Sequence, residues 1–135
     1  MKWVLLALAI LGIATSSLAL REHYRTDVSP CDINERWDCG IVNHSPYALI
    51  RGIPVAVIGI AGYLVLGTLS LRRAYSLMLA GALAGLAFSL YLARIEEHVL
   101  GVWCIYCAIS LGTISSITLL LIATVLVQTL RKRAA

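Results

Sequence analysis

Residues 102–128 read VWCIYCAISLGTISSITLLLIATVLVQ, an uncharged, largely apolar run that carries two cysteines near its start. Three further uncharged runs cover residues 3–20, 53–71 and 74–93. Each is about 18 residues or longer, which is enough for a helix to cross a hydrocarbon core of roughly 30 Å. The sequence therefore predicts an all-α integral membrane protein, a bundle of four transmembrane helices that forms a single domain over residues 1–135.

The composition agrees with a membrane location and sets the expected orientation. Apolar residues make up 60% of the chain and charged residues 13%, whereas soluble domains carry about 25% charged residues. Because Lys and Arg accumulate in cytoplasmic loops, both termini are expected in the cytoplasm of a cell that holds the protein in its plasma or inner membrane. The net charge of +4 then reflects topology, and it does not call for nucleic-acid binding. The predicted cytoplasmic cations are Lys2, Arg72, Arg73, Arg131, Lys132 and Arg133.

The first apolar run has a second interpretation. Lys2, a short apolar core and the small residues of 17–19 also resemble a secretory signal with its cleavage site. Cleavage would leave three transmembrane helices. The cysteines would stay on the outer side in either case.

Residues 21–52 form the long polar segment of the chain, predicted as an outer loop between the first two helices. A loop of this length within a small domain is typically functional or disordered. Ser45 is a suitable N-cap and Pro46 suits a first helical position. We therefore expect a short surface helix from Tyr47 to Ile50, with both of these side chains facing the bundle.

Small residues recur along the second and third apolar runs. Gly81, Gly85 and Ser89 follow one another at four-residue steps, a spacing that lets helices approach closely in lipid. Gly59 and Gly62 either serve the same packing or leave room for a bound ring. No acidic or basic residue lies in the middle of a run, which argues against a small multidrug transporter because intramembrane charges usually mark such pathways.

Cys104 and Cys107 form a CxxC motif at the start of the last run. Three residues apart, they share one helix face. At a helix start the first sulfur lies near unpaired N–H groups and the positive end of the helix dipole, which favour its thiolate. Cys107, one turn deeper, is expected to meet an apolar ligand first. Trp103 and Tyr106 are either interfacial anchors or groups that pack on a planar ligand.

Cys31 and Cys39 lie in the outer loop, separated by seven residues. They are either a static disulfide, common in oxidising compartments, or one half of a relay with the CxxC by thiol–disulfide exchange. A zinc site of all four cysteines is a third option, but the oxidising location disfavours it, and no metal is expected.

Other polar and aromatic residues are predicted at the membrane surface. His44 and His98 are either exposed interfacial residues or proton donors to a reduced quinone. Glu96 and Glu97 are expected at a solvated loop edge. Trp37 is expected to anchor the loop at the interface.

The order of these motifs along the chain resembles the vitamin K epoxide reductase family in its microbial stand-alone form. The resemblance runs from Cys31 to Leu120. It rests on Cys31–x₇–Cys39, then Ser45, then Gly52–Ile53–Pro54–Val55–Ala56–x₂–Gly59–x₃–Tyr63, and finally Trp103–Cys104–Ile105–Tyr106–Cys107. Quinone reductases of the DsbB type share the chemistry, but they place their CxxC in the first outer loop.

The resemblance implies a membrane thiol–quinone oxidoreductase that supports disulfide formation outside the cytoplasm. A reduced thioredoxin-like protein would attack the Cys31–Cys39 disulfide, with Cys31 as the preferred sulfur. Cys39 would then exchange with Cys104, and Cys107 would reduce a membrane quinone. Two resting states are chemically reasonable. One has the disulfides Cys31–Cys39 and Cys104–Cys107, and the other has a Cys39–Cys104 disulfide.

The resemblance also implies which residues surround the quinone. Ser45 matches a Ser or Thr that supports the cap over the site. In the animal enzymes, an Asn and a Tyr hydrogen-bond the quinone head, and the matching positions are Val55 and Leu111, which cannot do so. We therefore expect reduction of menaquinone or ubiquinone rather than of an epoxide. The expected lining residues are Val55, Gly59, Tyr63, Trp103, Tyr106 and Leu111.

The remaining expectations concern partners. The chain ends at Ala135 without a thioredoxin-like domain, so its expected partner is a separate CxxC protein, secreted or anchored in the membrane. The protein itself is expected to be a monomer. The competing hypothesis is a non-enzymatic four-helix membrane protein whose disulfides are structural.

Overall fold

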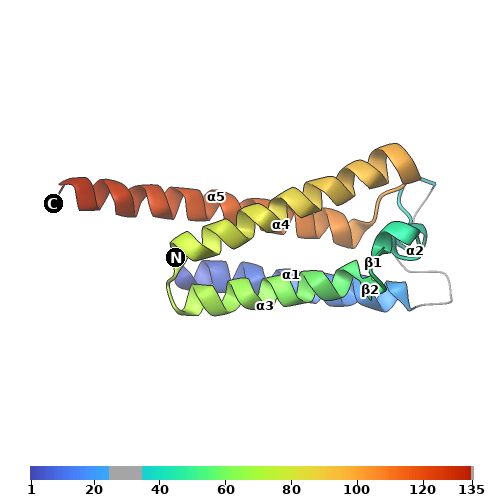
Figure 1. Ribbon diagram of the computed structural model, residues 1–135, viewed down its shortest axis with the longest axis horizontal. Helices are drawn as coiled ribbons and strands as arrows, with labels where there is room; N and C mark the ends of the chain where they lie inside the picture. Colours follow the sequence, from blue (N-terminus) through green and yellow to red (C-terminus); the bar gives the residue numbers. More distant parts are fainter. Residues whose placement is uncertain (25–34, 135) are drawn as a thin grey trace.

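A computed structural model of the protein describes residues 1–24 and 35–134 (Figure 1). Four long helices run along the molecule. These are α1 (Lys2–His23), α3 (Val55–Leu71), α4 (Tyr75–Ile95) and α5 (Ile105–Ala134). Between α1 and α3 lie the short elements α2 (Cys39–Asn43), η1 (Pro46–Ala48), β1 (Leu49–Ile50) and β2 (Ile53–Pro54), and between α4 and α5 lies the π-helical turn η2 (Glu96–Leu100).

Three helical segments in the described residues are long and apolar enough to cross a membrane. They are Lys2–His23, Tyr75–Leu100 and Ile105–Ala134. The fourth predicted span corresponds to α3, an apolar helix of 17 residues. Because about 17 residues is the lower limit for a crossing helix, a fourth span stays a prediction.

The helix ends differ from the apolar runs of the sequence. α1 continues past residue 20 to His23, and α5 continues past residue 128 to Ala134, since neither extension contains a Gly or Pro that would end a helix. Conversely, α3 starts two residues later than predicted because Ile53 and Pro54 pair as a strand. α5 starts at Ile105, because the residues before it pair with the loop between α1 and α3.

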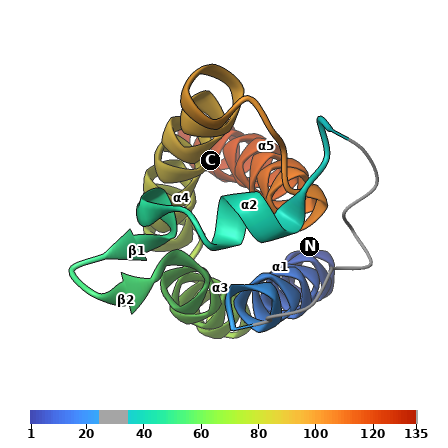
Figure 2. The same cartoon turned by 90° about the vertical axis from the view of Figure 1, so that its right-hand side faces the viewer.

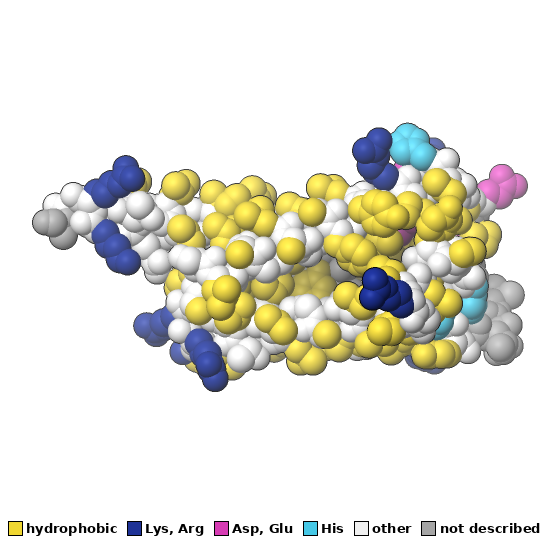
Figure 3. All heavy atoms as spheres, viewed as in Figure 1, with side chains coloured by type: hydrophobic (Ala, Val, Ile, Leu, Met, Phe, Trp, Pro, Cys, Tyr) yellow, Lys and Arg dark blue, Asp and Glu magenta, His cyan; other side chains and the backbone are white. Residues whose placement is uncertain are grey.

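The helices pack around a buried core and present an apolar exterior. Met78, Ile117 and Leu121 are fully buried at the centre of the bundle. Many large apolar side chains point outward along the middle of the molecule, while charged residues gather toward its ends (Figure 3). Such an exterior suits contact with lipid chains.

Glycine contacts tie the helices together at close range. Gly81 of α4 faces the Leu66 side chain of α3, and Gly85 faces Ile114 of α5. The tightest approach involves Gly12 of α1, which lies flat against the ring of Tyr63. Tyr63 is buried and reaches α5, where its hydroxyl donates to the carbonyl oxygen of Ser110 at 3.0 Å. Tyr63 therefore connects three helices at one level of the bundle.

The predicted surface helix from Tyr47 to Ile50 is wrong in extent. A single 3₁₀ turn, η1, is followed by the two-stranded hairpin β1–β2, in which Ile50 pairs with Ile53. The two turn residues, Arg51 (φ 52°) and Gly52 (φ 82°), both have positive φ, which a tight two-residue hairpin requires. Tyr47 and Ile50 are 42% and 39% exposed. The hairpin's backbone pairing thus replaces the second half of the expected helix.

Ser45 precedes η1, as predicted for an N-cap, but its side chain does not cap the helix. Its hydroxyl donates instead to the carbonyl oxygen of Val42 at 2.8 Å. Ser45 thereby fastens the end of α2, which lies across the end of the bundle (Figure 2).

The contact between Gly12 and Tyr63 generates a stability prediction. A Cβ at position 12 would overlap Cε1 of the Tyr63 ring, so Gly12→Ala should destabilise the protein by roughly 1–3 kcal/mol, the usual range for overpacking. Thermal unfolding in detergent measures the change. Gly67→Ala is the matched control, because its Cβ would meet Leu6 at 3.6 Å, an ordinary contact. Equal stability of the two variants would contradict the close approach of α1 to Tyr63.

Candidate functional site

The loop between α1 and α3 is joined to the segment before α5 by backbone pairing. Trp37 and Trp103 form a parallel bridge. The Asp38 N–H donates to the carbonyl oxygen of Trp103 at 2.9 Å, and the Trp103 N–H donates to that of Arg36 at 2.7 Å. The two indole rings lie 6.4 Å apart between centroids. We call this pairing of residues 36–38 with Trp103 the loop clamp.

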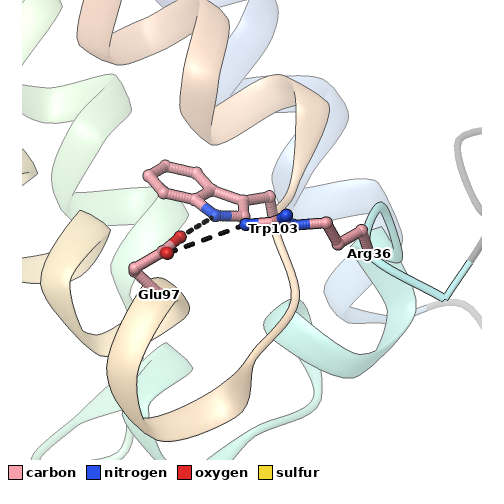
Figure 4. A network of polar contacts seen from close by, with 3 residues as sticks. All are labelled: Arg36, Glu97 and Trp103. Atoms are coloured by element: carbon pink, nitrogen blue, oxygen red, sulfur yellow. Dashed lines mark hydrogen bonds and ion pairs between the residues drawn. The ribbon is translucent and has the colours of Figure 1, made fainter.

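Side chains of η2 reinforce the loop clamp from the other side (Figure 4). The Trp103 indole N–H donates to Oε2 of Glu97 at 2.6 Å. Oε1 of Glu97 forms an ion pair with Arg36 at 3.7 Å. Both charged groups are largely exposed, so the pair adds little energy on its own and serves mainly to orient the indole.

The clamp brings the backbones of two cysteine positions together. Cys104 follows Trp103 directly, and α2 begins at Cys39, two residues after Trp37. The Asp38 carboxylate accepts a hydrogen bond from the Ile41 N–H at 3.0 Å, which supports the start of α2. Cys31 lies outside the described residues. The loop clamp thus brings the backbone of Cys39 near that of Cys104, and the exchange between them stays a prediction.

The two cysteines of the CxxC motif have different surroundings. Cys104 precedes α5 and is 0% exposed, packed against Val42 of α2 and Val102. Cys107 lies in the first turn of α5 and is half-buried. As the spacing predicted, Cys107 lies about one helical turn deeper than Cys104 at the start of α5.

Neighbouring groups favour the thiolate of Cys104. A hydrogen bond with the Cys107 side chain lowers the pKa of Cys104 below that of an ordinary cysteine, although burial opposes the shift. The side-chain amide of Asn43 adds to the lowering, because its Nδ2 lies 3.5 Å from the Cys104 sulfur and can donate to it. Asn43 comes from α2 and is itself buried. Helix α2 thus both covers Cys104 and provides a hydrogen-bond donor to its sulfur.

A cavity of about 570 Å³ lies inside the bundle and opens between α3 and α4 (Figure 3). Cys107 lines it, whereas Cys104 does not. Its volume is in the range of small-molecule sites. The six residues that the family resemblance assigned to a ligand all line this cavity: Val55, Gly59, Tyr63, Trp103, Tyr106 and Leu111.

The cavity is largely apolar, and some of its polar groups are already engaged. The Tyr63 hydroxyl bonds the carbonyl and the side-chain oxygen of Ser110, at 3.0 and 2.8 Å. Gly62 leaves open space, since nothing lies within 4 Å of a Cβ built there. Such a site suits a planar apolar molecule.

The prediction of a solvated Glu96 is wrong. Glu96 is 3% exposed, lines the cavity and accepts a hydrogen bond from the Cys104 N–H at 3.3 Å. Glu97 alone fits the expectation of an exposed edge. A sequence signal for its burial existed. Glu96 follows Ser89 by seven residues, or two helical turns, so it lies on the same helix face as Gly85 and Ser89. Asn43 was also missed, and no periodic pattern marks it.

Two other expectations concern exposed groups and metals. His44 and His98 are exposed, and His44 stacks on His23 with 6.3 Å between ring centroids. Within residues 1–24 and 35–134, no group of three His, Cys, Asp or Glu side chains is placed to hold a metal ion. The four-cysteine zinc alternative involves Cys31 and so lies outside this description.

The Asn43 contact generates a prediction about ionisation. Asn43→Ala should raise the pKa of Cys104, because the thiolate loses a hydrogen-bond donor. The pH dependence of thiolate absorbance, measured in a background with Cys31→Ser and Cys39→Ser, should therefore move to higher pH. Ile41→Ala, on the exposed side of α2, is the control and should leave the curve in place. An unshifted curve in Asn43→Ala would contradict the contact.

Comparison with known protein families agrees with this arrangement. The model of the vitamin K epoxide reductase family matches residues 3–125, from α1 through most of α5. Among curated proteins, none matches the chain. The matched residues include the loop clamp, both CxxC cysteines and the cavity. The chain therefore belongs to the vitamin K epoxide reductase family, and it is a membrane oxidoreductase with thiol and quinone chemistry.

Proposed function

We propose that the protein oxidises a thioredoxin-like partner outside the cytoplasm and passes the electrons to a membrane quinone. One observation carries the proposal: the two CxxC thiols face different surroundings. Cys104 is sealed under α2 beside the loop clamp, and Cys107 lines the apolar cavity. Electrons that enter through the loop therefore leave through a site open to lipid.

The proposed relay moves two electrons by disulfide exchange. The dithiol of the partner attacks the Cys31–Cys39 disulfide and leaves oxidised, while the loop pair becomes reduced. Cys39 then attacks Cys104 of the Cys104–Cys107 disulfide, and Cys31 resolves the mixed disulfide. Finally, Cys104 and Cys107 form their S–S bond again, and a quinone takes up two electrons and two protons to become a quinol.

Burial explains why the loop cysteines are needed. The sulfur of Cys104 has no exposed surface, because Val42 and Asn43 of α2 cover it. A bulky protein partner cannot reach it in this conformation. The backbone of Cys39, by contrast, lies at the start of that same cover, so movement of α2 would deliver one cysteine to the other.

The apolar character of the cavity supports a quinone rather than an epoxide. Val55 and Leu111 line it without hydrogen-bonding groups, and the Tyr63 hydroxyl is engaged by Ser110. We propose menaquinone or ubiquinone as the acceptor. We further propose that α3 is the fourth transmembrane span, that both termini are cytoplasmic and that the protein acts as a monomer.

The first test removes the proposed quinone-facing thiol. Cys107→Ala should abolish quinone-dependent oxidation of a thioredoxin-like CxxC protein in membranes, since no second sulfur remains to close the disulfide. Ser116→Ala, exposed on the same helix, is the control and should keep full turnover. Unchanged turnover in Cys107→Ala would overturn the relay and favour the hypothesis of structural disulfides.

The second test fills the cavity. Gly62→Phe should raise the KM for a short-chain quinone by about tenfold or more, which corresponds to roughly 1.4 kcal/mol of lost binding. The matched control is Gly112→Phe, because Gly112 is also helical with open space at its Cβ but does not line the cavity. Equal KM values in the two variants would place the quinone elsewhere.

A further inference from the structure

The structure contains a buried acid that the relay described above does not use. Glu96 begins η2, the π-helical turn through which the chain leaves α4, and Gly101 follows this turn as its C-cap. π-Helical turns are rare in proteins, and those that occur are often found at functional sites. Gly101 has φ +70°, a conformation that glycine adopts without strain. This turn points the side chain of Glu96 inward, while its neighbour Glu97 points outward to the loop clamp (Figure 4).

Glu96 contacts both residues of the CxxC motif, Cys104 through its backbone and Cys107 through its side chain. Its Oε2 accepts the Cys104 N–H at 3.3 Å, and its carboxyl group also hydrogen-bonds the Cys107 side chain. Among the described residues, the titratable side chains that interact with Glu96 are these two thiols, and His23, Tyr47 and Tyr63 also line the cavity. Glu96 and Cys107 line the same cavity. One carboxyl group thus contacts a reacting sulfur and borders the space proposed for the acceptor.

A merely structural role does not require an acid here. Burying a carboxyl group costs free energy unless it is well paired, and a neutral side chain could accept a single N–H. A buried titratable group beside a reactive thiol in a cavity is a common mark of proton transfer. The reaction itself demands protons, because quinol formation consumes two.

We propose, on the basis of the function proposed above, that Glu96 carries the Cys107 proton to the quinone. As a carboxylate, Glu96 accepts the proton of the Cys107 thiol. Cys104 and Cys107 then form an S–S bond, and their two electrons pass to the quinone. Protonated Glu96 donates its proton to one quinone oxygen and returns to the carboxylate. The Cys104 proton leaves to the outer aqueous phase, which supplies the second proton of the quinol, so atoms and charge balance.

The test isolates quinone reduction from thiol exchange. The full-length protein, reduced with a phosphine that is then removed, is mixed in lipid nanodiscs with a short-chain ubiquinone, and quinol formation is followed from acid to alkaline pH. Glu96→Gln should slow this step by about 10²–10⁴-fold, the usual contribution of general acid–base catalysis, and should remove its pH dependence. Glu96→Asp should recover part of the rate together with the pH dependence.

Two controls distinguish a loss of proton transfer in Glu96→Gln from general damage to the site. His98→Gln, exposed on the same turn, should keep the wild-type rate and pH profile. In a second measurement without quinone, oxidised Glu96→Gln should oxidise one equivalent of a reduced CxxC protein at the wild-type rate, because that step does not need the proton.

The outcomes separate this inference from the proposed function. A Glu96→Gln variant with the wild-type rate and pH profile, in a protein that Cys107→Ala inactivates, would overturn the role of Glu96 and leave the relay intact. Loss of both half-reactions in Glu96→Gln would also overturn it, because Glu96 would then only hold Cys104 in place. If Cys107→Ala remains active, the proposed function itself fails.

Discussion

The pairing of residues 36–38 with Trp103 is the constraint on which the rest of the site depends. Two backbone hydrogen bonds, of 2.9 and 2.7 Å, keep the segment before α5 extended. Helix α5 consequently begins at Ile105, and Cys104 stays at the boundary while Cys107 enters the bundle. The same bonds hold α2 across the end of the bundle (Figure 2). One short bridge thus positions the CxxC and its cover together.

The bundle beneath this boundary is tight on one side and hollow on the other. Tyr63 links α1 and α5 through its contact with Gly12 and its hydrogen bond to Ser110. α3 and α4 approach each other near their connection and diverge toward the CxxC end (Figure 1). The cavity lies in that divergence. Since its opening faces the apolar exterior, a lipid-soluble ligand can enter without crossing water.

The predictions that failed have physical causes in tertiary contacts. Glu96 follows an apolar run and precedes another acid, so its local composition is typical of a solvated edge, yet it is buried where the π-helical turn begins. Leu49 and Ile50 were expected to end a surface helix, yet a two-residue turn at Arg51 and Gly52 pairs them with Ile53 and Pro54 as a hairpin. In both places a short irregular segment overrides local propensity.

The sequence by itself determined the helical architecture and the chemistry. Apolar runs of membrane-spanning length depend only on local composition and the thickness of a bilayer, and the spacing of Cys104 and Cys107 places them on one helix face whatever surrounds them. The tertiary structure alone decided that Asn43 covers Cys104, that Glu96 contacts the Cys104 backbone and the Cys107 side chain, and that a cavity reaches Cys107. These relations join residues far apart in the chain, and they depend on how helices pack and diverge, which no local periodicity records.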